Sequence, residues 1–343
     1  MREKEIYQAL PMLLVPWYEQ NKRDLPWRKS RDPYRVWLSE IMLQQTRVEA
    51  VRDRYILFLE TLPTVNDLAA ASEEVLLKLW EGLGYYSRAR NLHKAAKAVA
   101  EMGGEFPCSA AELQKLPGIG EYTAGAISSI CFDEPIAAVD GNVLRVLSRV
   151  LASEKPIDDP RVKAEMTEKL TAVYPKENCG DFTQSFMDLG SGICTPRSPR
   201  CDACPLSSIC RAKAKGIAEK LPIKSPKKEK RQEKLTLFLL ECDGSIAIER
   251  RCAKGVLNGL WQLPNVGGTL TPAEALAAAE TLGVQPITLV RELHREHIFT
   301  HIRWEMTCYH VRCLSQSGPF TWATERELDE KYALPTAFRK LLD

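Results

Sequence analysis

The chain has 343 residues, of which 45% are hydrophobic and 27% are charged, and its formal net charge is +2. This length predicts two domains, and the apolar content is sufficient for well-formed cores. No run of about 18 apolar residues occurs, which excludes a transmembrane helix. The first ten residues lack the apolar stretch of a signal peptide, so we expect a cytoplasmic chain with reduced thiols at its eleven cysteines.

Positive charge is concentrated in residues 211–234, which hold ten Lys or Arg and three Asp or Glu. This segment carries a net +7, which leaves −5 on the rest of the chain. Overall charge therefore gives no argument for a nucleic-acid partner, and any basic surface must be local.

The first part of the chain, from about residue 5 to 214, predicts helices. Apolar residues at three- and four-residue steps in 34–62, 64–84 and 87–104 favour amphipathic helices, and residues 108–132 predict helix, turn and helix. Residues 215–234, with three basic clusters and two prolines, predict a linker.

Strands are expected from residue 235 onward. Residues 234–251 contain two β-rich runs joined at Asp243–Gly244, which is a strong hairpin signal. A short helix at 271–284 and further strands at 296–314 make this part α+β. We therefore predict a helical domain over 1–214, a linker over 215–234 and an α+β domain over 235–343.

Four cysteines form a compact group with the spacing C-x6-C-x2-C-x5-C: Cys194, Cys201, Cys204 and Cys210. Four thiolates within 17 residues favour a [4Fe–4S] cluster. A zinc site is the alternative, although four-cysteine zinc sites usually come as two C-x2-C pairs and this segment has one. Arg197 and Arg200 lie inside the group and are candidates for phosphate contacts.

Three further positions suggest chemistry. The turn "LPGIG", with Gly118 and Gly120, exposes backbone N–H groups at a helix start and predicts a phosphate site, although a plain helix C-cap is the alternative. Asp140 precedes a glycine and is either a helix cap or a carboxylate facing a sugar. Glu40 shares a helical face with Val36 and Trp37, which predicts a raised pKa unless this glutamate is exposed.

The turn at Gly118 and Gly120, Asp140 and the cysteine spacing together resemble those of the helix-hairpin-helix DNA glycosylases with an iron–sulfur cluster. Within them the chain is similar, over nearly its whole length, to the adenine-removing MutY type. The resemblance implies that Glu40 protonates adenine and later activates water, and that Asp140 stabilises positive charge on the sugar. It also implies that Asn142 helps to position the sugar and the water. Tyr122 stands where the similar endonuclease III carries a lysine, so no Schiff base is expected and the strand should remain intact.

The same resemblance implies further contacts with DNA. Trp27 and Arg28 in "DLPWR" are expected at the pocket of the extruded base, with Gln184 at a position that holds a carboxylate in some members. Gln45 in "LQQT" corresponds to an intercalating residue. Leu83 and Tyr85 in "GLGYY" are expected to contact DNA, Tyr85 by stacking.

The second domain resembles the Nudix-like domain of this family. A Nudix hydrolase needs several glutamates for Mg²⁺, and residues 272–284 hold Leu276–Ala277 and Glu280–Thr281 where a fuller acidic set is expected. The resemblance therefore implies a reader of 8-oxoguanine. Its recognition residues would be Phe299, Thr300 and His301, with Thr300 replacing the serine that the family carries; an ordinary strand is the alternative.

The expected partner is double-stranded DNA with adenine opposite 8-oxoguanine or guanine, bound by a monomer, with no membrane association. If the source is bacterial, we expect the protein at the nucleoid. Two alternatives remain open: a pyrimidine-lesion glycosylase of the endonuclease III type, and a non-catalytic DNA-binding protein that contains a cluster.

Overall fold

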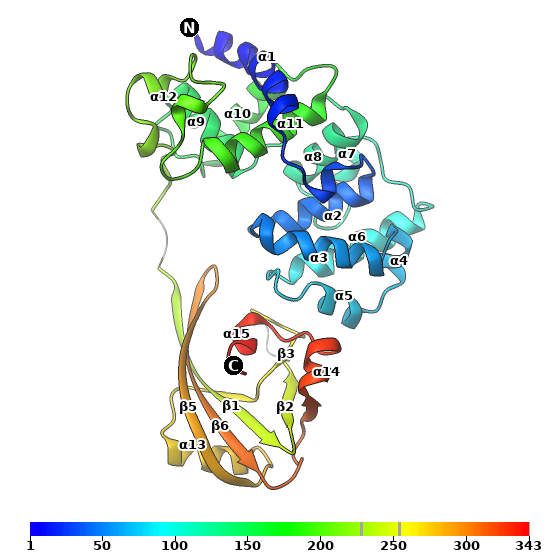
Figure 1. The fold of residues 1–343 in the computed structure, drawn as a ribbon, viewed down its shortest axis with the longest axis vertical. Helices are drawn as coiled ribbons and strands as arrows, with labels where there is room; N and C mark the ends of the chain where they lie inside the picture. Colours follow the sequence, from blue (N-terminus) through cyan, green and yellow to red (C-terminus); the bar gives the residue numbers. More distant parts are fainter. Residues whose placement is uncertain (227–228, 253–254, 343) are drawn as a thin grey trace. The chain divides into compact units, whose positions relative to one another are not determined.

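The computed structural model describes residues 1–226, 229–252 and 255–342. Its chain forms two compact units. Unit 1 contains Met1–Ala70 and Asn91–Pro226, and unit 2 contains Ala71–Arg90 and Lys227–Asp343. Figure 1 shows the elements of both units along the sequence. Each unit is described by itself below.

Unit 1 is helical, as predicted. Its elements are α1 (Glu3–Asn21), η1 (Pro26–Arg28), α2 (Pro33–Leu43), α3 (Val48–Thr61), α4 (Val65–Ala70), α6 (Ser87–Glu101, which begins in unit 2), α7 (Ala110–Leu113), α8 (Glu121–Phe132), α9 (Gly141–Leu151), α10 (Pro160–Thr171), α11 (Cys179–Asp188), η2 (Leu189–Ile193), η3 (Cys201–Ala203), α12 (Arg211–Ala214) and η4 (Ala218–Lys220).

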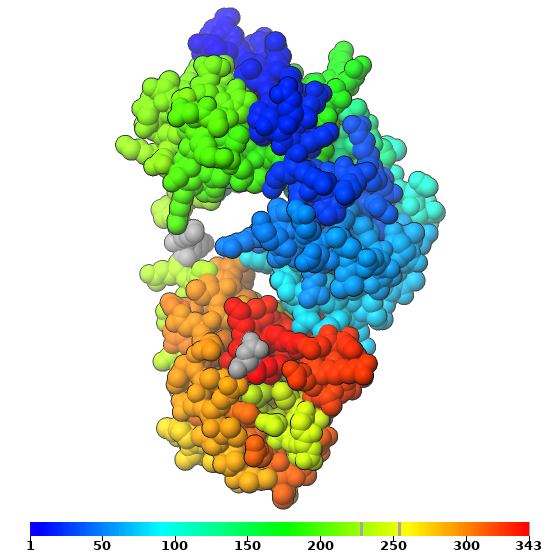
Figure 2. Space-filling view, in the orientation of Figure 1, coloured from blue at the N-terminus to red at the C-terminus, as the bar shows by residue number. Residues whose placement is uncertain are grey.

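One hydrophobic core of unit 1 lies between α1, α9 and α11. Leu10 and Leu14 of α1 are fully buried there against Val146 and Leu147 of α9 and Phe182 of α11. The buried residues of α1 recur at three- and four-residue steps, as expected for a core-facing amphipathic helix: Tyr7, Leu10, Leu14 and Tyr18. Figure 2 shows α1, in dark blue, lying against the green segment that includes α11.

The predicted linker is partly folded. Its first part, with η4, packs Ala218 and Leu221 against Ala212 of α12, and the Ile157 N–H donates to the carbonyl of Ile223 at 3.0 Å. Its last residues, from Arg231, already belong to a strand. Folded structure therefore extends into the predicted linker from both sides.

Unit 2 is built on a sheet with the strand order β3-β2-β1-β6-β5, to which β4 adds at β1 and β7 at β2. The long central pair β1 and β6 is parallel, and β5 and β6 are antiparallel. Its elements are α5 (Glu73–Leu79), β1 (Arg231–Cys242), β2 (Ser245–Arg250), β3 (Trp261–Gln262), β4 (Asn265–Gly267), α13 (Pro272–Thr281), β5 (Pro286–Ile298), β6 (Ile302–Cys313), β7 (Thr321–Thr324), α14 (Glu325–Glu330) and α15 (Thr336–Arg339).

Alternating side chains of β1 build a core on each face of this sheet. Leu237 and Leu239 pack with Trp304 and with Phe338 of α15, whereas Phe238 and Leu240 pack on the other face, in the cluster that includes Ala275 of α13. This is the period of two that a strand requires. The predicted hairpin at Asp243–Gly244 is present, with φ values of 49° and 72°.

Residues 71–90 belong to unit 2, although their helical pattern grouped them with the first domain in our prediction. The reason is long-range packing: Lys78 of α5 donates to the carbonyl of Leu328 at 2.9 Å, and Arg250 pairs with Glu74. A local helical pattern shows that a helix forms but does not show which surface it packs against.

Across the part of the chain that the structure describes, no helix combines the length and the apolar character needed to span a bilayer.

Candidate active site and cluster loop

Glu40 lies on α2 and is 6% exposed. The helix begins with Asp32 as N-cap and Pro33 in its first turn, which is favourable start chemistry. The Tyr122 hydroxyl donates to Glu40 Oε2 at 2.6 Å. Burial raises the pKa of Glu40 to about 7, with a further increase from the charge of Asp140, while the bond from Tyr122 opposes the shift. The predicted pKa rise is confirmed, and such a carboxyl group can donate a proton near neutral pH.

Asp140 is the N-cap of α9. Its Oδ1 accepts from the backbone N–H groups of Asn142 and Val143, each at 2.8 Å, and its Oδ2 accepts from Asn142 Nδ2 at 2.7 Å. Burial raises the pKa of Asp140, and these hydrogen bonds, together with the charge of Arg145, act in the opposite direction. The capping interpretation of Asp140 is therefore correct, and the same bonds fix the carboxylate at the mouth of a helix.

The turn and the aspartate line one cleft in unit 1. Gly118, Gly120, Tyr122 and Asp140 all contribute to its wall, and it encloses about 990 Å³ that is partly open to solvent. Glu40 is linked to this wall through its hydrogen bond with Tyr122. The structure therefore brings together the predicted anion turn and the two predicted carboxyl groups. Lys163 and Gln44 also line the cleft, although the sequence did not identify them as site residues.

The two glycines of the turn serve different purposes. Gly118 has a φ of +76°, and a Cβ there would lie 2.6 Å from Cβ of Asn91. Gly120 is the N-cap of α8 at a φ of −89°, and a Cβ there would meet nothing within 4 Å. The first glycine is thus needed by the fold. The second leaves the start of α8 open to a ligand, which is the arrangement expected of an anion site.

The predicted base-pocket residues are held by buried neighbours. Trp27 packs edge to face on Tyr55, with ring centroids 5.5 Å apart. Arg28 forms a two-pronged ion pair with Asp188 at 2.5 and 2.8 Å. Gln184 is half-buried on α11, one turn before Asp188. Asp188 was not predicted as part of this site. It ends α11 and lies 160 residues from Arg28 in the sequence, so no local pattern connects the two residues.

The segment after α2 carries the predicted intercalating residue. Gln45 is exposed and has a φ of 56°, a left-handed conformation that a non-glycine residue adopts only when its surroundings impose it. The adjacent Gln44 donates from Nε2 to Thr123 Oγ1 of α8 at 3.3 Å. This bond ties the Gln45 turn to the helix that starts at Gly120.

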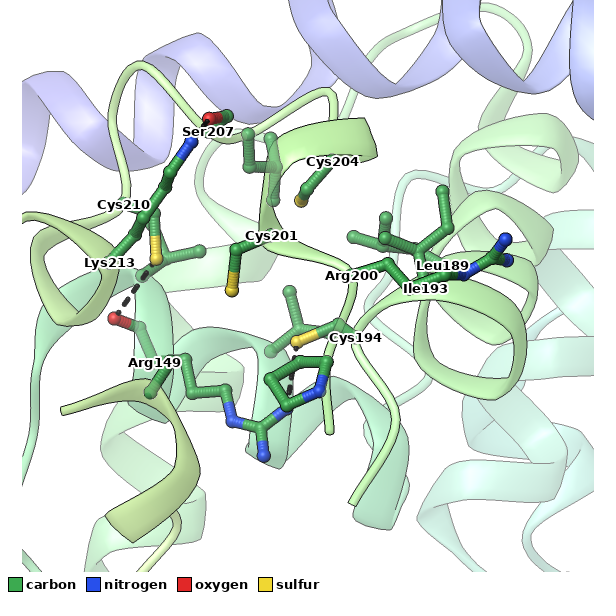
Figure 3. Close-up of a pocket in the computed structure, with 15 residues that line it drawn as sticks. Arg149, Leu189, Ile193, Cys194, Arg200, Cys201, Cys204, Ser207, Cys210 and Lys213 are labelled. Atoms are coloured by element: carbon green, nitrogen blue, oxygen red, sulfur yellow. Dashed lines mark hydrogen bonds between the residues drawn. The ribbon is translucent and has the colours of Figure 1, made fainter. Parts of the chain in front are cut away.

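The four cysteines line one pocket, as Figure 3 shows. Its wall is otherwise largely apolar, with Val146, Leu189, Ile193 and Leu206. Within residues 1–226, 229–252 and 255–342, no three His, Cys, Asp or Glu side chains lie close enough together to ligate a single metal ion. Four thiols around a largely apolar cavity are the donor set of a multi-iron cluster.

Two buried arginines of α9 hold the cluster loop. Arg149, which is 1% exposed, donates to the carbonyls of Leu221, Thr195 and Pro196 and to Cys194 Sγ at 3.3 Å. Arg145 donates to the carbonyl of Cys194 at 2.8 Å and to Asn142 Oδ1 at 2.9 Å. Because Asn142 also bonds Asp140, a continuous hydrogen-bonded path joins the loop to the cleft. Sequence reasoning missed both arginines.

The predicted lesion-reading residues meet in unit 2. A pocket of about 1120 Å³ is lined by Leu83, Tyr85, Phe299, Thr300 and His301. The hydroxyl groups of Tyr85 and Thr300 lie 3.2 Å apart and share a hydrogen bond. Phe299 is fixed between His297 and Trp304, with ring centroids at 4.6 and 4.8 Å. Leu83 is 4% exposed and also lines this pocket.

Family models match three parts of the chain. The HhH-GPD superfamily of base excision DNA repair proteins matches residues 38–172, the iron-sulfur binding domain of endonuclease III matches residues 194–210, and the NUDIX domain matches residues 236–343. Together with the cleft and the cysteine loop, they define the class: a helix-hairpin-helix DNA glycosylase of base-excision repair with a [4Fe–4S] cluster and a Nudix-like domain.

Whole-chain relatives and solved structures narrow this class. The human adenine DNA glycosylase is 35% identical over 96% of this chain and 72% of its own length, and the mouse protein is 36% identical over 96% and 76%. A thermostable thymine-DNA glycosylase is similar in structure, with a TM-score of 0.56, 27% identity and coverage of 62% of this chain and 97% of its own. Endonuclease III in a non-covalent DNA complex gives a TM-score of 0.53 and 26% identity over 63% and 99%. The chain belongs to the adenine DNA glycosylase family.

Proposed function

We propose that this chain, as a monomer, hydrolyses the N-glycosidic bond of adenine opposite 8-oxoguanine or guanine in duplex DNA and leaves the strand intact. The observation that carries the proposal is the pair of carboxyl groups at one cleft. Glu40 has a pKa of about 7 and is bonded to Tyr122, while Asp140 is fixed at the start of α9 by three hydrogen bonds. Adenine is the proposed base because the chain belongs to the adenine DNA glycosylase family.

The order of events follows from these positions. The Gly118–Gly120 turn binds a phosphate next to the extruded nucleotide through the N–H groups at the start of α8. Glu40, protonated, transfers its proton to the adenine ring, which makes the base a neutral leaving group. The C1′–N9 bond breaks, its electron pair stays with the base, and the ionised Asp140 stabilises the positive charge left on the sugar. Glu40, now a carboxylate, accepts a proton from the water that adds to C1′.

Tyr122 supports a reaction that ends at an abasic site. A lysine at this position would offer an amine to C1′, whereas the phenol of Tyr122 donates its hydrogen bond to Glu40. Burial, followed by the charge of Glu40, raises the pKa of Tyr122 well above its ordinary value, so the phenol remains protonated. Its contribution is to orient the Glu40 carboxyl group.

The cluster loop has a supporting role in this proposal. Cys194, Cys201, Cys204 and Cys210 would hold the [4Fe–4S] cluster, which, when bound, supplies a rigid centre with no open iron for Lewis-acid chemistry. Arg145 connects the loop backbone to Asn142 and thereby to Asp140. Iron and sulfide analysis of the purified chain, with absorbance in the thiolate-to-iron region, tests this assignment against zinc.

Unit 2 is proposed to read the base opposite the adenine. Its helix α13 has Glu274 and Glu280 as acidic residues, and the Glu274 carboxylate accepts from both the N–H and the hydroxyl of Thr271 in a capping box. One of the two glutamates is thus occupied in starting the helix, which supports reading over Mg²⁺-dependent hydrolysis. The Tyr85, Phe299 and Thr300 pocket supplies the reading surface.

Single-turnover base release tests the proposal. Duplexes with adenine opposite 8-oxoguanine, guanine or thymine are incubated with the chain, and half of each sample is treated with alkali. We expect alkali-dependent cleavage at adenine, fastest opposite 8-oxoguanine. Release of thymine or of an oxidised pyrimidine would favour the endonuclease III type, and no release would favour a binding protein. Strand cleavage without alkali, or efficient trapping by borohydride, contradicts the proposed absence of a Schiff base.

A further inference from the structure

Residues 71–90 join two different environments inside unit 2. Helix α5 is hydrogen-bonded to the region of α14 through Lys78, and the turn that follows carries Leu83 and Tyr85 into the reading pocket. The segment therefore connects an anchor to a recognition surface over fewer than ten residues. The contacts at its anchored end have no part in the chemistry described above.

The anchor is an ion pair between Lys78 and Glu81. Lys78 Nζ lies 2.5 Å from Glu81 Oε2, and the two side chains are 17% and 12% exposed. The same ammonium group donates to the carbonyls of Leu328 at 2.9 Å and Tyr332 at 3.3 Å. Glu81 Oε1 accepts from the N–H of Leu334 at 3.2 Å. Carbonyls near the end of a helix such as α14 lack partners within the helix, so this cation satisfies them.

Two other ion pairs tie the segment to unit 2, but they are more exposed. Arg90 pairs with Glu73 at 2.7 Å and also donates to the carbonyl of Asn258 at 2.9 Å. Arg250 pairs with Glu74 while lying over the ring of Trp261. Exposed pairs contribute little because solvent screens them, whereas half-buried pairs that also satisfy backbone groups fix geometry. Lys78 and Glu81 therefore form the principal anchor.

The turn after Glu81 adopts a conformation that needs support. Gly82 and Gly84 have φ values of +89° and +69°, and Tyr85, which has a side chain, has a φ of 46°. Trp80 Nε1 donates to the carbonyl of Gly84 at 3.1 Å and closes the turn. At the far end Tyr85 bonds Thr300. A shift of Glu81 would thus be transmitted through one tight turn to the Tyr85 and Thr300 contact.

We propose that the Lys78–Glu81 pair is a positioning device that sets the preference for the base opposite the adenine, by holding Tyr85 in register with Thr300. The inference rests on the proposed reading of 8-oxoguanine by this pocket. Without the ion pair, the turn loses its fixed position. Recognition of the lesion then weakens, while Glu40 and Asp140, which lie in unit 1, keep their own hydrogen bonds.

The experiment compares single-turnover adenine release opposite 8-oxoguanine and opposite guanine. Lys78→Met keeps the aliphatic length and removes the charge and its donors. We expect the 8-oxoguanine-to-guanine rate ratio to fall by about fivefold or more, as for a broken coupling between sites. The rate opposite guanine should stay within about twofold of the wild-type rate, which corresponds to a free-energy change smaller than RT.

The matched control is Lys115→Met. Lys115 forms the same kind of pair, with Glu112 three residues away at 2.6 Å, but it is exposed in unit 1. Its removal should leave the ratio unchanged. Glu81→Gln is the conservative second variant, because the amide oxygen still accepts from Leu334 N–H while the charge is lost; it should lower the ratio by a smaller factor. Circular dichroism and iron content establish that each variant is folded.

The outcomes separate the two proposals. A ratio that survives both Lys78→Met and Glu81→Gln in folded protein overturns this inference alone. So does an equal loss of both rates, because that is the signature of a general structural role. If Lys78→Met does not fold, the ratio of Glu81→Gln decides in the same way. A wild-type chain with no preference for 8-oxoguanine overturns the proposed function, and this inference with it.

Discussion

The proposed active-site cleft in unit 1 and the proposed reading pocket in unit 2 are built on opposite principles. In the cleft, Glu40 is buried and Asp140 accepts three hydrogen bonds, so burial and fixed partners set the protonation of each group. In the reading pocket, Tyr85 is 47% exposed and Thr300 is exposed, and their hydroxyl groups bond each other. Chemistry requires perturbed groups in low dielectric, whereas reading requires a surface that remains accessible to DNA.

This difference predicts how each region fails. A lost carboxyl group in the cleft removes a step of the reaction, so the rate should fall by orders of magnitude. A lost contact in the reading pocket removes one of several recognition contacts, so selectivity should change by a smaller factor. The predictions below test this contrast from the largest effect to the smallest.

Asp140→Asn should show the largest loss. Asparagine still caps α9, so folding and duplex binding should persist, but the charge that stabilises the sugar cation is gone. We expect single-turnover adenine release to fall by at least about 10³-fold. Asp159→Asn is the control, because Asp159 is likewise the N-cap of a helix, α10, outside the cleft. Near-wild-type release by Asp140→Asn, or an equal loss in Asp159→Asn, contradicts the mechanism.

Glu40→Gln should be almost as damaging. Glutamine fills the same space and can still accept from Tyr122, but it cannot supply a proton to the base. Loss of a general acid corresponds to about 10²- to 10⁴-fold in rate. Quantified base release at fixed pH measures this, with binding of an uncleavable duplex as the control for recognition. A reduced affinity with an unchanged rate constant would place Glu40 in binding instead.

The pH profile of base release tests how Glu40 is tuned. Its protonated form is the acid, and its pKa is about 7, so the rate should decline as the pH rises through about 7. In the wild type, the hydrogen bond from Tyr122 favours the carboxylate form of Glu40 and lowers its pKa. Tyr122→Phe removes this bond, so the pKa of Glu40 should rise. The falling limb should therefore move to higher pH in this variant. A limb that stays in place or moves to lower pH would show that Tyr122 does not tune Glu40.

The cleft was more predictable from the sequence than the reading pocket. Glu40, the turn at Gly118 and Gly120, and Asp140 carry local signals: an apolar helical face, a glycine pair and a residue that caps a helix. The catalytic roles of the two carboxyl groups came from the family resemblance, because local signals alone favour an exposed glutamate and a plain cap. Hydrophobic periodicity predicted the helices of the first region and the strands of the second, and the resemblance supplied the fold family. The cysteine loop was equally plain, because its four ligand candidates lie within 17 residues.

What the sequence did not reveal depends on contacts between distant residues. Asp188 meets Arg28 across 160 positions, Arg149 reaches Leu221 across 72, and Lys78 reaches Leu328 across 250. No local pattern identifies such partners, because a buried arginine and an exposed one look alike in a single sequence. The assignment of residues 71–90 to unit 2 escaped prediction for the same reason.

Arg149→Met should destabilise unit 1 and reduce the iron content. The guanidinium is buried and donates to three backbone carbonyls and to Cys194 Sγ, and methionine leaves these acceptors without a donor. Unsatisfied buried groups of this kind cost about 1 to 3 kcal/mol each, so we expect the free energy of unfolding to fall by at least about 2 kcal/mol. Urea unfolding followed by circular dichroism measures the change. Arg197→Met, in the same loop, is the control for loss of charge alone.

Thr300 should give the smallest effects and tests the reading pocket at single-group resolution. Thr300→Ser keeps the hydroxyl that bonds Tyr85 and removes one methyl group at an exposed position, so the 8-oxoguanine-to-guanine rate ratio should change by less than about threefold. Thr300→Val keeps the shape and removes the hydroxyl, so it should lower the ratio by about 2- to 12-fold, the value of one hydrogen bond. If valine is tolerated and serine is not, the methyl group and not the hydroxyl reads the lesion. If neither change moves the ratio, reading depends on Phe299 and the backbone around it, and the contrast between a fixed cleft and an adaptable pocket would need to be redrawn.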